Sequence, residues 1–211
     1  MRAIFVYFAC SIGLSAFAQS TTLYVNNFET NEVGKAPAEF LVLDGGFAVK
    51  EDNGNKLLEL PGAPLDSFAV QFGPAESENV ALSARIKGTA KGRRFPTFGI
   101  GLNGTAGYKL QVSPGKKLLE IYQDQDAKAA VPYEWKSDQW IKLRLEVRKA
   151  KEGEWKIEGK AWVEGRPEPD QWMISVETTE SPTAGKASLF GSPFAGTPIQ
   201  FDDLLLSGLK K

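Results

Sequence analysis

The stretch "WIKLRLEVRK", residues 140–149, decides the fold class, because apolar and charged side chains alternate along it. This period of two is that of a β-strand with one face toward a core and the other toward solvent. The stretch "VALSARIK", residues 80–87, repeats the pattern. One apolar and one polar face per strand is typical of a two-layer antiparallel sandwich. The apolar positions of the first stretch are Ile141, Leu143, Leu145 and Val147, and the charged ones are Lys142, Arg144, Glu146 and Arg148.

Short apolar runs continue from these stretches in both directions, separated by turn signals such as Asn53-Gly54 and Asn103-Gly104. No segment keeps a helical period over twelve residues or more, so the chain is predicted to be all-β. The number of strands exceeds that of an immunoglobulin sandwich and suits a larger, two-sheet antiparallel jelly roll. The predicted strands are residues 23–28, 47–50, 56–60, 68–72, 80–87, 97–102, 108–113, 118–123, 140–149, 155–163, 172–177, 187–190 and 199–207.

The first 18 residues have the pattern of a secretory signal peptide. A positive start at Arg2 precedes an apolar run, and the segment ends in Ala16-Phe17-Ala18, a small-residue cleavage pattern. The apolar run of about 14 residues is too short for a membrane-spanning helix, which needs roughly 20. We therefore expect a secreted or periplasmic bacterial protein with one domain, residues 19–211, and no membrane insertion after cleavage.

The composition excludes several kinds of chemistry. The chain has no histidine, and its one cysteine, Cys10, lies inside the predicted signal peptide. Nucleophile systems that need His or Cys, and zinc or copper sites built from them, are therefore excluded from the mature domain. Carboxylate, Lys or Tyr chemistry and all-oxygen metal sites remain open. A net charge of −1 without a long basic stretch argues against nucleic-acid binding.

A second informative stretch, "GKAWVEGRPEPDQWMIS", residues 159–175, holds two of the five tryptophans around a loop that Pro167 and Pro169 stiffen. Together with the closing strand "IQFDDLLLSGL", residues 199–209, this W-x-x-G-x-x-E-P-x-x-W pattern resembles the concanavalin A-like lectin/glucanase jelly rolls. The nearest resemblance is to laminin-G-like or family-16-glycoside-hydrolase-like accessory domains of secreted bacterial proteins. It covers nearly the whole mature chain.

The resemblance implies a non-catalytic carbohydrate-binding domain that holds a poly- or oligosaccharide on a sheet face. A polysaccharide hydrolase or lyase is the alternative. Its family motif, Glu-x-Asp-x-x-Glu, is broken in Glu120-Ile121-Tyr122-Gln123-Asp124, where Tyr122 takes the place of the middle Asp. A structural or protein-adhesion sandwich is a third possibility, because laminin-G-like domains also bind proteins.

Alternation along the strands selects candidate sugar ligands. It places Tyr122 and Glu120 opposite Leu119 and Ile121, on a polar face, and assigns other side chains to polar faces in the same way. If their strands are neighbours, an aromatic and basic patch forms, and arginine forks on it would favour an acidic glycan. The candidates are Tyr122, Trp162, Arg144, Gln111, Glu120 and Arg85, with Phe95, Tyr133 and Trp135 as a second, loop-rim choice.

Two smaller features complete the set of candidates. Glu29, after the first strand, and Asp203, in the last strand, are hard oxygen ligands that could hold a structural Ca²⁺ if these two strands lie side by side. The basic loop at residues 91–94, Lys-Gly-Arg-Arg, is of a kind that attracts anionic glycans.

Overall fold

The computed structural model describes residues 21–63, 66–194 and 196–210, so the predicted signal peptide lies outside the described residues. Among the residues described, no helix is long and apolar enough to cross a membrane. The strands are β1 (Thr21–Asn26), β2 (Leu41–Asp44), β3 (Ala48–Asp52), β4 (Asn55–Leu60), β5 (Phe68–Glu76), β6 (Val80–Gly88), β7 (Thr97–Leu102), β8 (Tyr108–Ser113), β9 (Leu118–Gln123), β10 (Asp126–Pro132), β11 (Ile141–Lys151), β12 (Glu154–Val163), β13 (Ile174–Thr178), β14 (Gly185–Ser192) and β15 (Ile199–Gly208).

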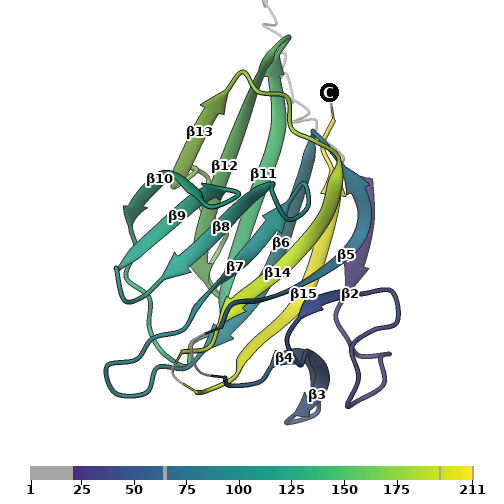
Figure 1. The fold of residues 1–211 in the computed structure, drawn as a ribbon, viewed down its shortest axis with the longest axis vertical. Coiled ribbons are helices and arrows are strands. Elements are labelled where there is room, and N and C mark those ends of the chain that lie inside the picture. Colours follow the sequence, from purple (N-terminus) through teal and green to yellow (C-terminus); the bar gives the residue numbers. More distant parts are fainter. Residues whose placement is uncertain (1–20, 64–65, 195, 211) are drawn as a thin grey trace, which may run out of the picture.

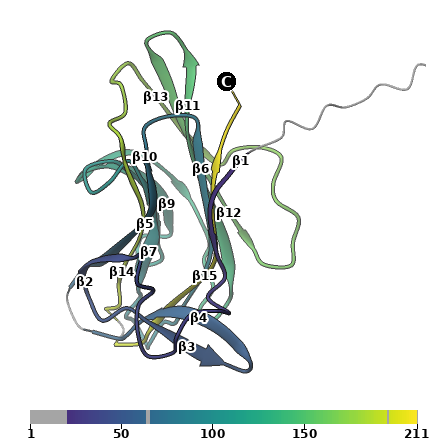
Figure 2. The ribbon, with the colours of Figure 1, turned by 90° about the vertical axis from the view of Figure 1, so that its right-hand side faces the viewer.

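These strands form two antiparallel sheets packed face to face, which confirms the predicted sandwich (Figures 1 and 2). Sheet A has the order β13-β12-β11-β6-β15-β4-β3, and β1 also pairs with β15. Sheet B has the order β10-β9-β8-β7-β14-β5-β2. Neighbouring strands are often far apart in sequence, as β6 and β15 are, and about half of the strand pairings in the described sheets join non-consecutive strands.

The core lies between the two sheets and is built from the apolar half of each alternating strand. Leu143 and Leu145 of β11 are fully buried there, beside Leu82 of β6. From sheet B, Ile100 and Leu110 face them across the sandwich and are also fully buried. Because removing apolar surface from water is the main source of folding free energy, this alternation selects which face of each strand turns inward.

Strand β15 changes partner half-way along its length. Residues 199–201 pair with β4, whereas residues 204–208 pair with β1. The register against β6 shifts between Asp202 and Leu205, and Asp203 has a positive φ of 50°. This bulge lies at the F-D-D motif and brings the first and last strands side by side, as the calcium prediction required.

Thirteen of the strands correspond to predicted ones, and the two that were missed, β2 and β10, are the outermost strands of sheet B. The missed segments lack the signal on which the prediction rests. The four residues of β2 are all exposed, and β10 carries three alanines, which have low β-propensity. An edge strand with one neighbour has weaker requirements for alternation than a central strand.

Candidate functional site on sheet B

The structure divides the predicted sugar ligands between two opposite surfaces. Gln111 of β8 and Glu120 and Tyr122 of β9 lie on sheet B. Arg85, Arg144 and Trp162 lie on β6, β11 and β12 of sheet A. The expectation that Tyr122, Trp162 and Arg144 form one patch is therefore wrong, because alternation assigns a side chain to a face but does not say which strands share a sheet.

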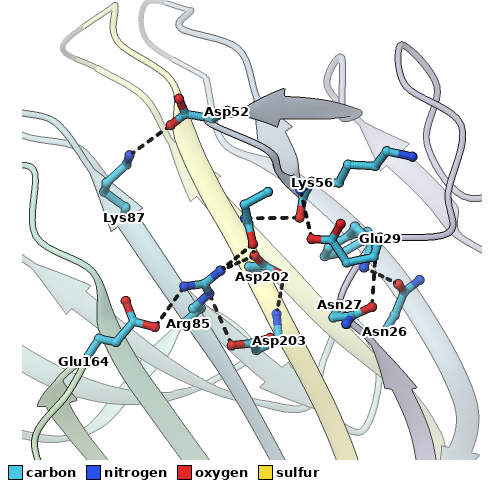
Figure 3. A network of polar contacts seen from close by, with 12 residues as sticks. Asn26, Asn27, Glu29, Asp52, Lys56, Arg85, Lys87, Glu164, Asp202 and Asp203 are labelled. Atoms are coloured by element: carbon cyan, nitrogen blue, oxygen red, sulfur yellow. Dashed lines mark hydrogen bonds and ion pairs between the residues drawn. The ribbon is translucent and has the colours of Figure 1, made fainter.

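The outer face of sheet A carries a network of ion pairs centred on Arg85. Arg85 donates to Glu164 at 2.8 Å and to Asp202 at 2.5 Å, and lies 3.2 Å from Asp203 (Figure 3). Its guanidinium also lies over the ring of Trp140, 4.7 Å from the centroid. Burial lowers the pKa of Arg85, but hydrogen bonds and the charge of Asp202 raise it above its ordinary value. The charge of this arginine is therefore matched by carboxylates of the protein itself.

The tryptophan-rich loop also lies over sheet A. In Figure 2 the connection that follows β12 runs along the outer side of the sheet. Lys160 anchors it: its ammonium contacts Glu168 at 2.8 Å, donates to the Pro169 carbonyl at 2.7 Å and lies over the Trp172 ring at 4.5 Å. Arg144 is paired with Glu146 at 2.6 Å. The loop thus covers this face and stabilises it, which gives the stretch a structural role.

Sheet B carries a hollow of about 370 Å³ on its outer face, over β5, β14, β7, β8 and β9. Its lining is rich in neutral amides and hydroxyls, with three aromatic rings, those of Phe68, Phe190 and Tyr122. Such a lining offers both hydrogen-bond donors and acceptors beside flat apolar surfaces. The polar side chains that line it include Gln71, Gln111, Ser67, Ser188 and Ser192, of which Gln71, Ser188 and Ser192 are themselves buried.

Two glycines of β7 shape the floor of this hollow. A Cβ on Gly99 would lie 2.6 Å from the ring of Phe190, and one on Gly101 would lie 2.5 Å from Oγ of Ser188. Because no side chain rises from these two positions, the ring and the hydroxyl of β14 lie across the middle of the sheet. The motif Gly99-x-Gly101 is therefore a packing device, consistent with the close sheet packing that this spacing suggests.

A second hollow, of about 610 Å³, adjoins the first and shares Gln111 with it. Arg93, Arg94 and Lys116 line it and make it basic. Two exposed rings, Phe95 and Phe194, line it as well and are 39% and 38% exposed. We call the smaller hollow the neutral end and this one the basic end of a single groove.

Glu120 lies under the groove and connects side chains of both ends. Although only 3% exposed, it accepts hydrogen bonds from Ser113 at 2.5 Å, Lys116 at 3.1 Å and Tyr122 at 3.1 Å. Burial raises the pKa of Glu120, but these hydrogen bonds and the charge of Lys116 outweigh burial and lower it below its ordinary value. The residue is therefore an ionised anchor that holds Lys116 and Tyr122 in place.

A glycosidase would need a pair of carboxyl groups in this groove. Among the described residues that line the two ends, only Asp124 carries a carboxylate. It lies in the turn after β9, where its φ is positive at 52°, whereas Glu120 is buried and does not line either end. The lining therefore lacks the pair of carboxyl groups that glycosidases use. Glu120, ionised and surrounded by donors, is also unsuited to be a general acid.

The second set of predicted aromatics is divided as well. Phe95 lines the basic end, whereas Tyr133 and Trp135 pack against the core. Burial raises the pKa of Tyr133 to about 12. Sequence reasoning missed Phe190 and Phe194. The strand pattern of β14 would have placed Phe190 on the face opposite Leu189, but not in a groove.

The predicted calcium ligands have other partners in the structure. Glu29 accepts a hydrogen bond from the backbone N–H of Lys56 at 3.0 Å, and Asp203 faces the guanidinium of Arg85 (Figure 3). The described residues contain no group of three or more acidic, His or Cys side chains that could hold a metal ion. This donor set does not fit a cation site, because an arginine stands where positive charge would have to bind. Calcium at Glu29 and Asp203 stays a prediction that these contacts do not favour.

Comparison with known proteins places the fold. No family model and no curated protein matches the chain. Among solved structures, the carbohydrate-binding module CBM66 from Bacillus subtilis superposes with a TM-score of 0.56 at 11% identity, over 81% of this chain and 96% of its own. A β-1,3-glucanase from Mycobacterium marinum gives 0.59 at 13% identity, over 88% and 98%. The metal-free carbohydrate recognition domain of Emp46p gives 0.56 at 11% identity, over 89% and 97%.

The fold is a concanavalin A-like jelly roll. The predicted fold class is thereby confirmed, and at these identities the likeness shows the fold alone. The neighbours include proteins named for carbohydrate binding and proteins named for cleavage, so the likeness does not separate the two activities. That distinction rests on the side chains of the groove.

Proposed function

We propose that this protein is a non-catalytic carbohydrate-binding domain that holds a poly- or oligosaccharide in the groove of sheet B. The observation that carries the proposal is the groove itself, in which amides and hydroxyls, three of them buried, lie beside aromatic rings. Flat aromatic faces stack on the apolar faces of sugar rings, and fixed polar groups bond the hydroxyls. The described lining contains only one carboxylate, that of Asp124, which supports binding without bond cleavage.

The proposal includes a location and a partner. A domain exported through the segment at residues 1–18 would meet glycans in the periplasm or outside the cell. We include acidic glycans among the partners, but the arginines that would bind them differ from those that the sequence pattern selected. Arg85 and Arg144 are paired on the opposite sheet, whereas Arg93 and Arg94 lie in the groove.

A glycan panel tests the proposal most directly. The mature domain should bind a subset of glycans. The substitutions Phe190→Ala and Gln111→Ala should each weaken that binding about tenfold, because each removes a side chain that lines the neutral end. The matched control is Trp162→Ala on sheet A, which should bind like the wild type. The folded state of each variant is checked by its circular dichroism spectrum and melting temperature.

The same samples test the enzymatic alternative, which Asp124 at the neutral end keeps open. Bound glycans are incubated with the protein and their chain length is followed by chromatography. Unchanged chain length over a day is the expected result. Shortening that disappears in Asp124→Asn would overturn the non-catalytic assignment, while binding to no glycan would overturn the carbohydrate assignment and favour a structural or protein-adhesion role.

A further inference from the structure

The basic end of the groove holds positive charge that the protein itself does not neutralise. Among the described residues, no ion pair joins Arg93 or Arg94 to a carboxylate, although most other arginines of the domain have such a partner. Lys116, on the opposite wall, contacts Glu120 but keeps more than half of its side chain exposed. Three cations and one buried anion leave this end with a net positive charge.

The loop that carries the two arginines is short and held by its own backbone. Lys91 and Arg94 exchange backbone hydrogen bonds of 3.0 and 3.1 Å, and Gly92 takes the positive φ of 62° that the tight turn requires. The turn is followed directly by Phe95, so that charge and ring are presented together. A guanidinium on a fixed turn loses less conformational freedom on binding than one on a long loop.

Two exposed rings in the same hollow add a second kind of contact. Phe95 and Phe194 come from segments far apart in sequence, yet both line the basic end beside the arginines. Both rings are more than a third exposed and form apolar surface in contact with water. Such surface is unfavourable in water, and a ligand that covers it would remove this cost. A sugar ring with an attached anionic group matches both features, because its flat face can stack while its anion meets the guanidinium forks.

From these observations we infer that the basic end is a subsite for a carboxylated or sulfated sugar, bound by Arg93, Arg94 and Lys116 beside Phe95 and Phe194. This inference rests on the proposed function, since it names the class of glycan that the groove takes. Gln111, shared by both ends, makes the groove continuous. One chain can therefore place a charged unit at the basic end and an uncharged unit at the neutral end.

The test compares polysaccharides that differ only in charge. Binding is measured by calorimetry for polygalacturonate against its methyl ester, and for dextran sulfate against dextran, so that carboxylate and sulfate are tested separately. The double variant Arg93→Gln/Arg94→Gln should weaken binding to the preferred anionic chain at least tenfold and leave binding to its neutral counterpart unchanged. The matched control, Lys142→Gln/Arg166→Gln, removes a half-exposed cation from sheet A and an exposed one from the loop after β12, and should bind like the wild type.

The outcomes separate this inference from the proposed function. Preference for one anionic chain that is lost in the double variant and reduced by raising the salt supports the inference. Equal affinity for charged and neutral chains overturns it while leaving carbohydrate binding intact. Equally strong binding of polyacrylate, a polyanion without sugar rings, overturns it too, because the site would then recognise charge alone. Binding to none of the polysaccharides removes the proposed function itself.

Discussion

The outer faces of the two sheets have opposite designs, although both are polar. On sheet A, Arg85, Arg144 and Lys160 each contact at least one carboxylate, and the loop after β12 lies over the sheet. On sheet B, glycines keep the floor low and amides line the hollow, while Arg93 and Arg94 have no acidic partner among the described residues. Charge on sheet A is used within the protein, and charge on sheet B is left for a ligand.

The difference shows that residue type alone does not identify a binding site. Sheet A has more arginine, lysine and tryptophan than sheet B, and arginine and tryptophan are enriched where proteins bind partners. What distinguishes the two faces is whether the charged side chains are already paired within the protein. A desolvated ion pair with good geometry has little capacity left to bind a ligand. The predictions below test this contrast, beginning with the largest effect.

Removing Arg85 should damage the fold more than any other substitution considered. Asp202 is 1% exposed and accepts side-chain hydrogen bonds from Arg85 and Asn55 and one from the backbone N–H of Asp203. Arg85→Leu therefore leaves a buried carboxylate without its counter-charge. Breaking a buried pair in this way costs about 3 kcal/mol or more. Urea unfolding should show this loss, while the folded fraction keeps its affinity for glycans.

The double variant Arg85→Leu/Asp202→Leu is the control for this prediction. If the cost arises from the unpaired carboxylate, removing both partners restores most of the lost stability. A double variant as unstable as Arg85→Leu would show that the arginine stabilises sheet A through its packing on Trp140 instead.

Tyr122 and Trp162 give the sharpest comparison of the two faces. Both are aromatic, half-buried and located near the end of a strand, but Tyr122 lines the groove and Trp162 lies on sheet A. Tyr122→Ala should lower glycan affinity about tenfold, or 1.4 kcal/mol, and Trp162→Ala should leave it unchanged. A loss in the tryptophan variant alone would move the binding site to sheet A.

Glu120 is expected to contribute stability that depends on pH. Its pKa is lower in the folded protein than in the unfolded chain, despite the opposing effect of burial, so its contribution is present above the unfolded value of about 4.3. That contribution is lost as the pH falls through the lower, folded value. Glu120→Gln should therefore reduce the free energy of unfolding by about 1 kcal/mol at pH 7.

Urea unfolding at pH 7, 5 and 3.5 measures this effect. The difference between wild type and Glu120→Gln should be constant from pH 7 to 5 and should shrink toward pH 3.5. Gln111→Glu is not a useful control, because it adds charge beside Glu120. Lys128→Gln, a substitution at an exposed position of β10, serves instead and should show no such narrowing. A difference that grows on acidification would contradict the assigned direction.

The sequence was sufficient for the fold because the fold depends on a local pattern. Alternation in residues 80–87 and 140–149 indicates which side chains point inward. The turn at Asn53-Gly54 joins β3 and β4 as these two residue types predict, and both residues have a positive φ. The two missed strands, β2 and β10, are exposed edges. Their pairing is set by the neighbouring strand more than by their own residues.

The site was predicted only in part because it depends on strand order, which no local pattern encodes. Gln111 and Tyr122 were selected correctly as residues of one surface and line the groove, but Trp162 was joined to them across a sandwich. Phe190 comes from β14, which lies beside β7 although some 90 residues separate them, and only long-range pairing brings it to the groove. The charge of the 91–94 loop is visible in the sequence. Its proposed role in binding depends on Phe194, which only the folded structure places in the same hollow.

Calcium gives the smallest expected effect and completes the contrast between the faces. Asp203 directs its carboxylate at Arg85 and Glu29 accepts a backbone N–H, so a cation added there would have to displace contacts that the fold already makes. We expect the melting temperature in 1 mM CaCl₂ and in excess EDTA to agree within measurement error. Stabilisation by calcium that Asp203→Asn abolishes would contradict this, since any ligand bound only by the folded state must raise its stability. The same result would show that a metal ion can replace ion pairs of sheet A, so that the charge on this face is not matched within the protein alone.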